Sequence, residues 1–230
     1  MKSILSTVLI SMFCGFWVMA LAQNRPDATI PQGENLQVPE GWEVRFDNVT
    51  DDFLIGAHPD SADIYFVNMT PGWHITSGPA AIYYHPANTA SGNYNINSEI
   101  HFFDPGERNR EAYGLFIGGT NLKNENQEYL YFLIRNTGEF LIKKRTGEET
   151  EVIQNWTKSN SILIYDNQEV SSVLNVLSLD VADDEVTFII NDKEVAKIDT
   201  HNHNTNGVFG LRVNHSINLH ISDLRMKDNN

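Results

Sequence analysis

The sequence predicts an all-β fold made of two packed antiparallel sheets. In the segment 177–226, short apolar-alternating stretches follow one another with a polar turn between each pair. Ile217, Leu219 and Ile221 fall on one face of such a stretch and the polar residues between them fall on the other, which is the period-two pattern of a half-buried strand. No long amphipathic helix follows Gln23.

Strands are predicted along the whole chain after residue 41. The predicted segments are 42–46, 64–68, 73–76, 81–85, 94–103, 113–118, 129–135, 139–145, 161–165, 174–181, 185–191, 194–199, 208–213 and 216–224. Strands in this number bury their apolar faces only in two packed sheets or in a barrel. The sequence shows no internal repeat and no interdomain linker, so we expect one domain over residues 41–227.

The N-terminus has the features of a secretory signal peptide. Lys2 precedes an apolar run from Ile4 to Leu21, and Ala20-Leu21-Ala22 places small residues at the two positions that a signal peptidase inspects. We expect residues 1–22 to be removed, residues 23–40 to form an irregular lead-in, and the mature protein to be secreted or periplasmic. The alternative is an uncleaved membrane anchor, although no basic cluster follows the run.

Composition limits the partners. Once Lys2 is removed, 15 basic residues face 30 acidic ones, and a surface of this charge repels nucleic-acid phosphates and anionic lipids. We therefore expect no nucleic-acid partner and, after signal cleavage, no membrane contact. The only cysteine, Cys14, lies in the signal segment, so an apolar core rather than a disulfide is expected to hold the mature domain together.

One hairpin can be placed in register from the sequence. Asn136-Thr137-Gly138 suits a three-residue loop with Gly138 in the left-handed conformation, which pairs Arg135 with Glu139. This register puts Phe132, Ile134, Phe140 and Ile142 on one face, which we assign to the core. The opposite face then carries an aromatic and basic group that we predict to be exposed and to bind ligand: Tyr129, Tyr131, Arg135, Lys143 and Arg145.

A second polar face is predicted on the strand 94–103. Its apolar residues alternate with a polar row made of Asn95, Asn97, Glu99 and His101. Amides, a carboxylate and an imidazole beside exposed tyrosine rings suit a carbohydrate, because they bond to hydroxyl groups while flat rings pack on the sugar face. The alternative is a solvated outer face without a ligand.

The order of several segments resembles a known group of domains. The segments are GWHITSGPAAIYYHPANTASGNYNINSEIHFF (72–103), AYGLFIGG (112–119), LNVLSLDVADDEVTFIINDKEVAKID (174–199) and NGVFGLRVNHSINLHISDLRM (206–226). They resemble the concanavalin A-like jelly-roll sandwiches, and most of all the exported bacterial branch with the 3-keto-disaccharide hydrolase-like and laminin G-like domains. The resemblance covers about Trp42 to Met226 and implies a two-sheet jelly roll. Its motifs belong to the fold, so it implies no particular reaction.

The family 16 glycoside hydrolases share this fold, and the segment 99–104 loosely resembles their Glu-x-Asp-x-x-Glu strand. Retaining hydrolysis needs two carboxyl groups about 5 to 5.5 Å apart. Here His101 replaces the middle carboxylate and Asp104 the last, and strict alternation turns Glu99 and Asp104 to opposite faces unless a bulge intervenes. Glu99, His101 and Asp104 are the only catalytic candidates from this resemblance, and whether the protein is an enzyme stays open.

No metal site is predicted. Related sandwiches carry structural calcium, but Asp51, Asp52, Asp60 and Asp63 match no EF-hand spacing, and solvated loop acids explain them. His201 and His203 share a face only in an extended chain, whereas HNHNTN favours a turn. We expect no cofactor, with structural calcium as the alternative.

These observations lead to one functional expectation and two alternatives. We expect an exported β-sandwich that binds carbohydrate, on or near polysaccharide, with a face made by the strands at Tyr94 and Tyr129. The first alternative is a glycan-cleaving hydrolase on the same fold. The second is a structural or protein-interaction module.

Overall fold

The computed structural model describes residues 30–48, 52–58, 61–76, 78–107, 110–166 and 169–229, and all of the regular structure in them is β. No helix in these ranges is long and apolar enough to cross a membrane. The predicted signal peptide, residues 1–22, lies outside them. The strands are β1 (Glu43–Phe46), β2 (Ile55–Gly56), β3 (Ile64–Asn68), β4 (Trp73–Thr76), β5 (Ala81–Ala90), β6 (Tyr94–Phe103), β7 (Ala112–Thr120), β8 (Glu128–Arg135), β9 (Glu139–Thr146), β10 (Glu149–Lys158), β11 (Ser172–Ala182), β12 (Glu185–Ile190), β13 (Lys193–Asp199), β14 (Gly207–Val213) and β15 (Asn218–Asp228).

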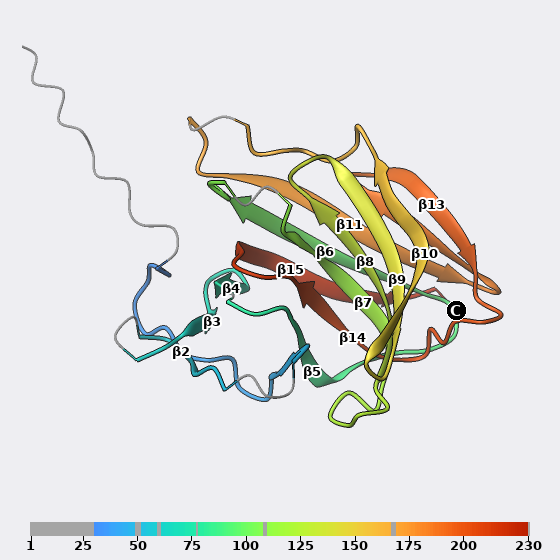
Figure 1. Cartoon of the computed structure of the whole chain (residues 1–230), viewed down its shortest axis with the longest axis horizontal. Coiled ribbons are helices and arrows are strands. Elements are labelled where there is room, and N and C mark those ends of the chain that lie inside the picture. The colour runs from blue at the N-terminus through green and yellow to red at the C-terminus, as the bar shows by residue number, and fades with distance from the viewer. Residues whose placement is uncertain are drawn as a thin grey trace, which may run out of the picture.

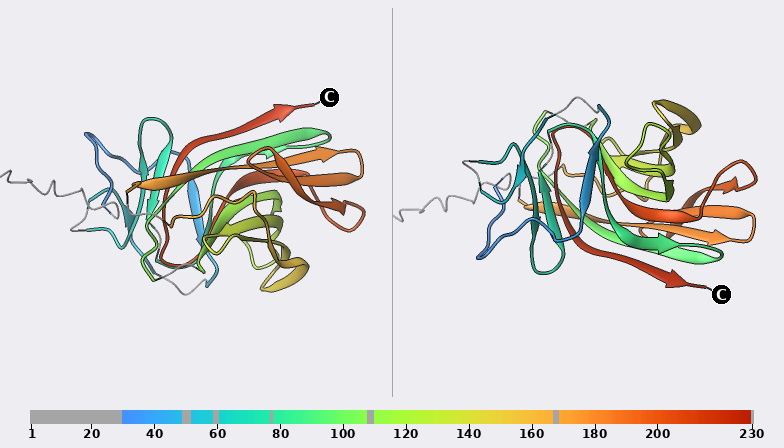
Figure 2. Two further views of the ribbon diagram at one scale, coloured as in Figure 1. Left: turned by 90° about the horizontal axis from the view of Figure 1, so that it is seen from above. Right: turned by 90° about the horizontal axis from the view of Figure 1, so that it is seen from below.

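These strands form two stacked sheets (Figures 1 and 2). Sheet A has seven strands in the order β1-β5-β14-β7-β8-β9-β10, and sheet B has eight in the order β13-β12-β11-β6-β15-β4-β3-β2. The pairings among the described residues are antiparallel except for β2 with β3, which is parallel. The prediction of an all-β, two-sheet sandwich is confirmed.

The core lies between the two sheets and is rich in aromatic rings. Phe132 of sheet A packs edge-to-face against Phe188 of sheet B, with ring centroids 5.2 Å apart. Phe102 of sheet B stacks on Tyr113 of sheet A, also at 5.2 Å. Each ring buries a large apolar area, so these contacts between the sheets contribute much of the stability of the described part of the chain.

The β8–β9 hairpin has the predicted register. Arg135 pairs with Glu139, and Phe132 pairs with Ile142. Gly138 has a φ of 75° and its N–H donates to the Arg135 carbonyl over 3.0 Å, so the left-handed glycine closes the turn as expected. Both core-facing pairs of the hairpin are fully buried between the sheets.

The opposite face of this hairpin is buried as well, so the prediction of exposed tyrosines is wrong. Tyr129 is 1% exposed and Tyr131 is 5% exposed. Both belong to a second apolar cluster on the outer face of sheet A, which also contains Ile82, Tyr84, Ala112, Phe116, Leu122, Leu133 and Leu141. The physical reason is visible in β8, where six apolar residues follow one another from Tyr129 to Ile134, the pattern of a strand buried on both faces.

The predicted strand 161–165 is instead a segment fastened by asparagine side chains. Asn136 and Tyr165 exchange two hydrogen bonds, of 3.0 and 2.6 Å, and Asn175 does the same with Leu163, at 2.9 Å for both bonds. The Asn191 amide donates to the carbonyl of Ser161 over 2.8 Å. These amides replace the neighbouring strand that the segment does not have.

Two strands were missed by the prediction. Strand β10 is polar and lies at the edge of sheet A, where its register against β9 shifts twice, so its sequence shows no regular alternation. Strand β2 has only two residues and pairs in parallel with β3. Neither strand interrupts the core.

We predict that Tyr131→Ala and Phe132→Ala are similarly destabilising, by about 3 to 5 kcal/mol each, because both rings are buried on their own side of sheet A. Urea denaturation measures both. Val152→Ala, at a side chain 49% exposed on the edge strand, is the control and should change the free energy of unfolding by about 0.5 kcal/mol or less. A Tyr131→Ala variant as stable as the control would show that the outer face of sheet A is open.

Candidate functional site

The predicted binding residues lie on two opposite faces of the sandwich, not on one. Strand β6 pairs with β11 and β15 in sheet B, whereas β8 pairs with β7 and β9 in sheet A. By alternation, the predicted binding residues of both strands lie on the face away from the core. The expectation that the strands at Tyr94 and Tyr129 build one face is therefore wrong.

The outer face of sheet A gathers basic side chains over its aromatic cluster. Cross-strand pairing places Lys143 beside Tyr131, Arg145 beside Tyr129, and Arg212 beside Ile82 and Gly114. Gly114 and Gly210 add no side chain to this face, and neither position has room for one, because an added Cβ would lie 2.0 or 2.4 Å from a backbone carbonyl of the neighbouring strand. We call the surface the arginine face, which comprises Arg45, Arg135, Lys143, Arg145 and Arg212.

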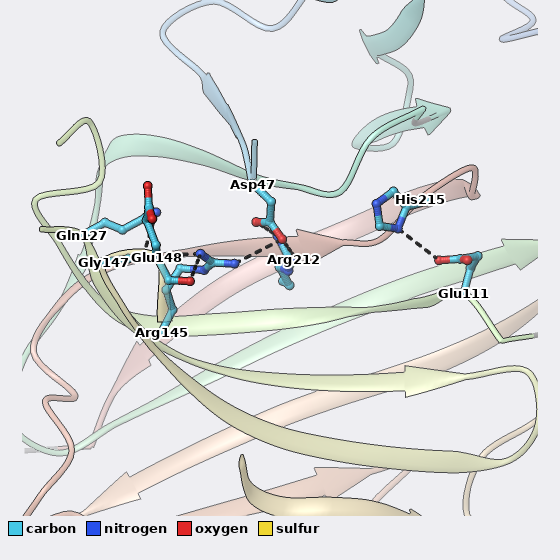
Figure 3. Close-up of polar contacts among 8 residues, drawn as sticks. All are labelled: Asp47, Glu111, Gln127, Arg145, Gly147, Glu148, Arg212 and His215. Atoms are coloured by element: carbon cyan, nitrogen blue, oxygen red, sulfur yellow. Dashed lines mark hydrogen bonds and ion pairs between the residues drawn. The ribbon is translucent and has the colours of Figure 1, made fainter. Parts of the chain in front are cut away.

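Asp47 joins two of these arginines (Figure 3). The Nη1 and Nη2 atoms of Arg212 donate to its two carboxylate oxygens over 2.6 Å each, and Nη2 of Arg145 lies 3.2 Å from Oδ2. Nη1 of Arg145 also donates to the carbonyls of Gly147 and Glu148, at 3.3 and 3.4 Å. The Arg212 guanidinium stands 5.6 Å from the centre of the Tyr131 ring. Asp47 thus fixes two planar cations above two tyrosines.

Both guanidinium groups are buried. Arg212 is 4% exposed, and Arg145 is 8% exposed, so the prediction that Arg145 is exposed is wrong too. Burial lowers the pKa of Arg212, but the neighbouring Tyr129 and Asp47 outweigh it and leave that pKa raised. Burial raises the pKa of Tyr131 to about 12, so its hydroxyl keeps its proton. The Nε atoms of Arg45, Arg145 and Arg212 are buried without an acceptor.

An aromatic ring and a hollow lie at the margin of the arginine face. The Arg135 guanidinium stacks 4.0 Å from the ring centre of Trp156, a half-buried side chain of β10, and pairs with Glu139 at 2.6 Å. A hollow of about 360 Å³ opens beside Asp47 and is also lined by Asn48, Phe53, Gly78, Pro79, Ala80 and His215. His215 Nδ1 lies 3.8 Å from a Glu111 carboxylate oxygen (Figure 3).

The polar row on β6 lies on the outer face of sheet B, where its members bond to neighbouring strands. Asn95 donates to Ser178 over 3.1 Å, Glu99 accepts from Ser222 over 3.1 Å, and His101 lies 3.4 Å from the Ser172 hydroxyl. The Asn97 side-chain oxygen is buried without a partner. Most of the donors and acceptors that were expected to meet a sugar are therefore engaged within the sheet.

His101 belongs to a row of three histidines that the sequence did not reveal. His220 pairs with His74 on one side and with His101 on the other, and the rings of His101 and His220 are 5.8 Å apart. Burial, and then the charge of His220, lowers the pKa of His74 to about 4. The pKa of His220 is lowered by burial and by His101, and that of His101 by burial, partly offset by Glu99.

The catalytic candidates do not form a carboxylate pair. Strand β6 pairs with β11 without interruption, so Glu99 and His101 share the outer face and Asp104 follows the end of the strand. The Asp104 carboxylate accepts from the Gly106 N–H over 2.8 Å, which closes a turn. Glu99 is therefore on the paired part of the strand and Asp104 is in the turn that follows it, and the two do not share a strand face.

No three His, Cys, Asp or Glu side chains converge on a metal position within the described ranges. Asp63 accepts from the Leu54 N–H over 2.9 Å, and His201 bonds to Asp199 in an exposed turn. Asp51 and Asp60, two of the possible calcium ligands, lie outside those ranges.

Sequence reasoning found three members of the arginine face and missed Arg45, Arg212, Asp47 and Trp156. Arg212 has a signal, since it is the only charged residue in the apolar strand Gly207–Val213. Asp47 has none, because its contact with Arg212 spans 165 positions of the chain. Trp156 is the only aromatic residue in the polar strand that was not predicted.

Comparison with known proteins identifies the fold. No family model and no curated protein matches the sequence. The carbohydrate-binding module CBM66 from Bacillus subtilis has a TM-score of 0.57 at 14% identity, over 84% of this chain and 98% of the module. A GH16 protein of a Bacteroides ovatus mixed-linkage glucan locus, solved with a G4G4G3G product, scores 0.51 at 11% identity, over 84% and 97%. A Bacillus subtilis protein of unknown function with a galectin-like fold scores 0.50 at 9% identity, over 80% and 88%. The chain has the concanavalin A-like jelly-roll fold, as predicted, and at these identities the likeness shows the fold alone.

We predict that acid destabilises the protein through the histidine row. The pKa of His74 is about 4 in the folded protein, against an ordinary value of 6.5. Between these two pH values His74 is therefore protonated in the unfolded chain and neutral in the folded chain. The free energy of unfolding should therefore fall between pH 6.5 and about pH 4, by about 3 kcal/mol from His74 alone.

Urea denaturation at a series of pH values tests this. His74→Gln should flatten the profile, whereas His58→Gln, in an exposed loop, should leave it unchanged. A parallel profile for His74→Gln and the wild type would contradict the assignment.

We also predict that Asp47→Asn lowers stability by about 2 kcal/mol, because it leaves the buried Arg145 and Arg212 without their shared anion. The melting temperature and urea denaturation measure the effect. Asp192→Asn, on an exposed turn, is the matched control. Equal stability of the two variants would mean that Asp47 does not hold the cluster together.

Proposed function

We propose that the protein binds carbohydrate and that the arginine face of sheet A is the binding surface. The observation that carries the proposal is the platform of Trp156 and Arg135, in which the guanidinium lies over a half-buried ring, 4.0 Å from its centre. A ring of this kind can pack on the apolar face of a pyranose. The fold supports the proposal, because a carbohydrate-binding module shares it over 98% of that module's length.

The arginine face is the better of the two predicted faces. It combines an aromatic platform, two half-buried cations that pair with no described carboxylate, Arg45 and Lys143, and the hollow beside Asp47. On the outer face of sheet B, Asn95, Glu99 and His101 already bond to serine hydroxyls of neighbouring strands. A sugar there would have to replace existing bonds, whereas on sheet A it adds new ones.

Glycan cleavage receives less support than binding. On the arginine face, Asp47 is held by two arginines. Burial raises the pKa of Glu43, but its bonds to Lys123 and Tyr84 outweigh burial and leave that pKa lowered. A general acid needs a raised pKa, so Glu43 is suited to hold its charge rather than to donate a proton.

We predict that Trp156→Ala weakens polysaccharide binding by about 1 to 3 kcal/mol, the range of other ring-stacking sites, with little loss of stability. Affinity electrophoresis in gels that contain a panel of polysaccharides measures retention, and thermal melting measures stability. Phe103→Ala, a half-buried ring on the outer face of sheet B, is the matched control. Loss of retention in Phe103→Ala but not in Trp156→Ala would move the site to sheet B.

A further inference from the structure

Two cations of the arginine face have no counter-ion. Arg135 is paired with Glu139, and Arg145 and Arg212 share Asp47. Arg45 and Lys143, both half-buried, form no ion pair or hydrogen bond with any described residue, and the Nε of Arg45 is buried without an acceptor. A partly desolvated cation without a counter-ion is less well stabilised than a paired one, so a bound anion would stabilise both side chains.

The surplus of positive charge is local and contrasts with the rest of the chain. The whole protein has a formal charge of −14, yet five of its 16 basic residues lie on this one face. Its carboxylates Glu43, Asp47 and Glu139 are each already bonded to a cation. A neutral sugar forms hydrogen bonds through its hydroxyl groups and packs on aromatic rings, but it carries no charge that would neutralise an unpaired cation.

The unpaired cations are widely spaced along the sheet. Arg45 is on β1 and Lys143 is on β9, five strands further along sheet A. Through space the two ends of this face approach each other, because Asp47, two residues after Arg45, lies 3.2 Å from Arg145, two residues after Lys143. Arg212 is on β14, between these two strands, and Arg145 shares β9 with Lys143, so positive charge recurs across the strands rather than at one point.

We propose that the ligand of this face is an anionic polysaccharide, whose carboxylate or sulfate groups meet Arg45 and Lys143. This inference rests on the proposed carbohydrate-binding function and names its ligand class. Two isolated cations on different strands fit a sparsely charged chain that crosses the strands. Duplex DNA, with one charge per about 1.7 Å, suits two isolated cations on an acidic protein less well.

Four polymers test the proposal by isothermal titration calorimetry at low and at high salt. Dextran sulfate and dextran share a backbone and differ in charge, polygalacturonate supplies carboxylates, and a double-stranded DNA supplies phosphates. We expect one or both anionic polysaccharides to bind about tenfold or more tightly than dextran, with an affinity that falls as salt rises. Which of the two binds identifies carboxylate or sulfate as the recognised group.

Variants locate the binding. Lys143→Gln and Arg45→Gln should each weaken binding of the anionic polysaccharide by about fivefold and reduce its salt dependence. Lys227→Gln, at an exposed position on β15 of sheet B, is the matched control and should change neither.

Three outcomes would overturn the inference. If neutral polysaccharides bind as well as charged ones and Lys143→Gln has no effect, the ligand is not anionic, although the proposed function stands. If the DNA binds more tightly than every polysaccharide, the face recognises a nucleic acid. If no polysaccharide in a broad panel binds the wild-type protein, the proposed function fails as well.

Discussion

Strand β8 is apolar on both of its faces, and much of the molecule follows from the need to cover both. Sheet B covers one face, where Phe132 meets Phe188. No second sheet covers the other face among the described residues, so side chains of sheet A cover it themselves. The aliphatic parts of Arg145 and Arg212 lie over the tyrosine layer, and Asp47 forms ion pairs with both of their guanidinium groups. The ion pairs are thus a consequence of the aromatic layer beneath them.

Asp47 also connects parts of sheet A that are distant in sequence. It follows the edge strand β1 and bonds to Arg212 of β14 and Arg145 of β9, which lie on different sides of β7 and β8. A partly buried ion pair adds little net stability when compared with apolar packing, but it restricts the paired side chains to few arrangements. In this protein it fixes where the cations of the arginine face stand, and it leaves Arg45 and Lys143 available.

The fold class and the β8–β9 register could be predicted because both depend on local pattern. Alternation places each residue on a face, and Gly138 sets the turn. Alternation does not show whether a face is exposed to solvent. The uninterrupted apolar run from Tyr129 to Ile134 was nevertheless a signal that both faces are buried. It also cannot assign strands to sheets, which is why β6 and β8 were placed on one surface. The cluster around Asp47 depends on contacts between distant segments, and no short pattern encodes them.

The asparagines that fasten residues 161–165 give the protein a chemical weak point. Asn136 and Asn175 each donate to and accept from the segment, as a peptide group would. Deamidation keeps the shape of the side chain but replaces the donor with an anionic oxygen. At Asn175, which is fully buried, a carboxylate would then face the carbonyl of Leu163 in a site with little water. The long-term stability of the segment 161–165 therefore depends on the rate of deamidation at Asn136 and Asn175 as well as on packing.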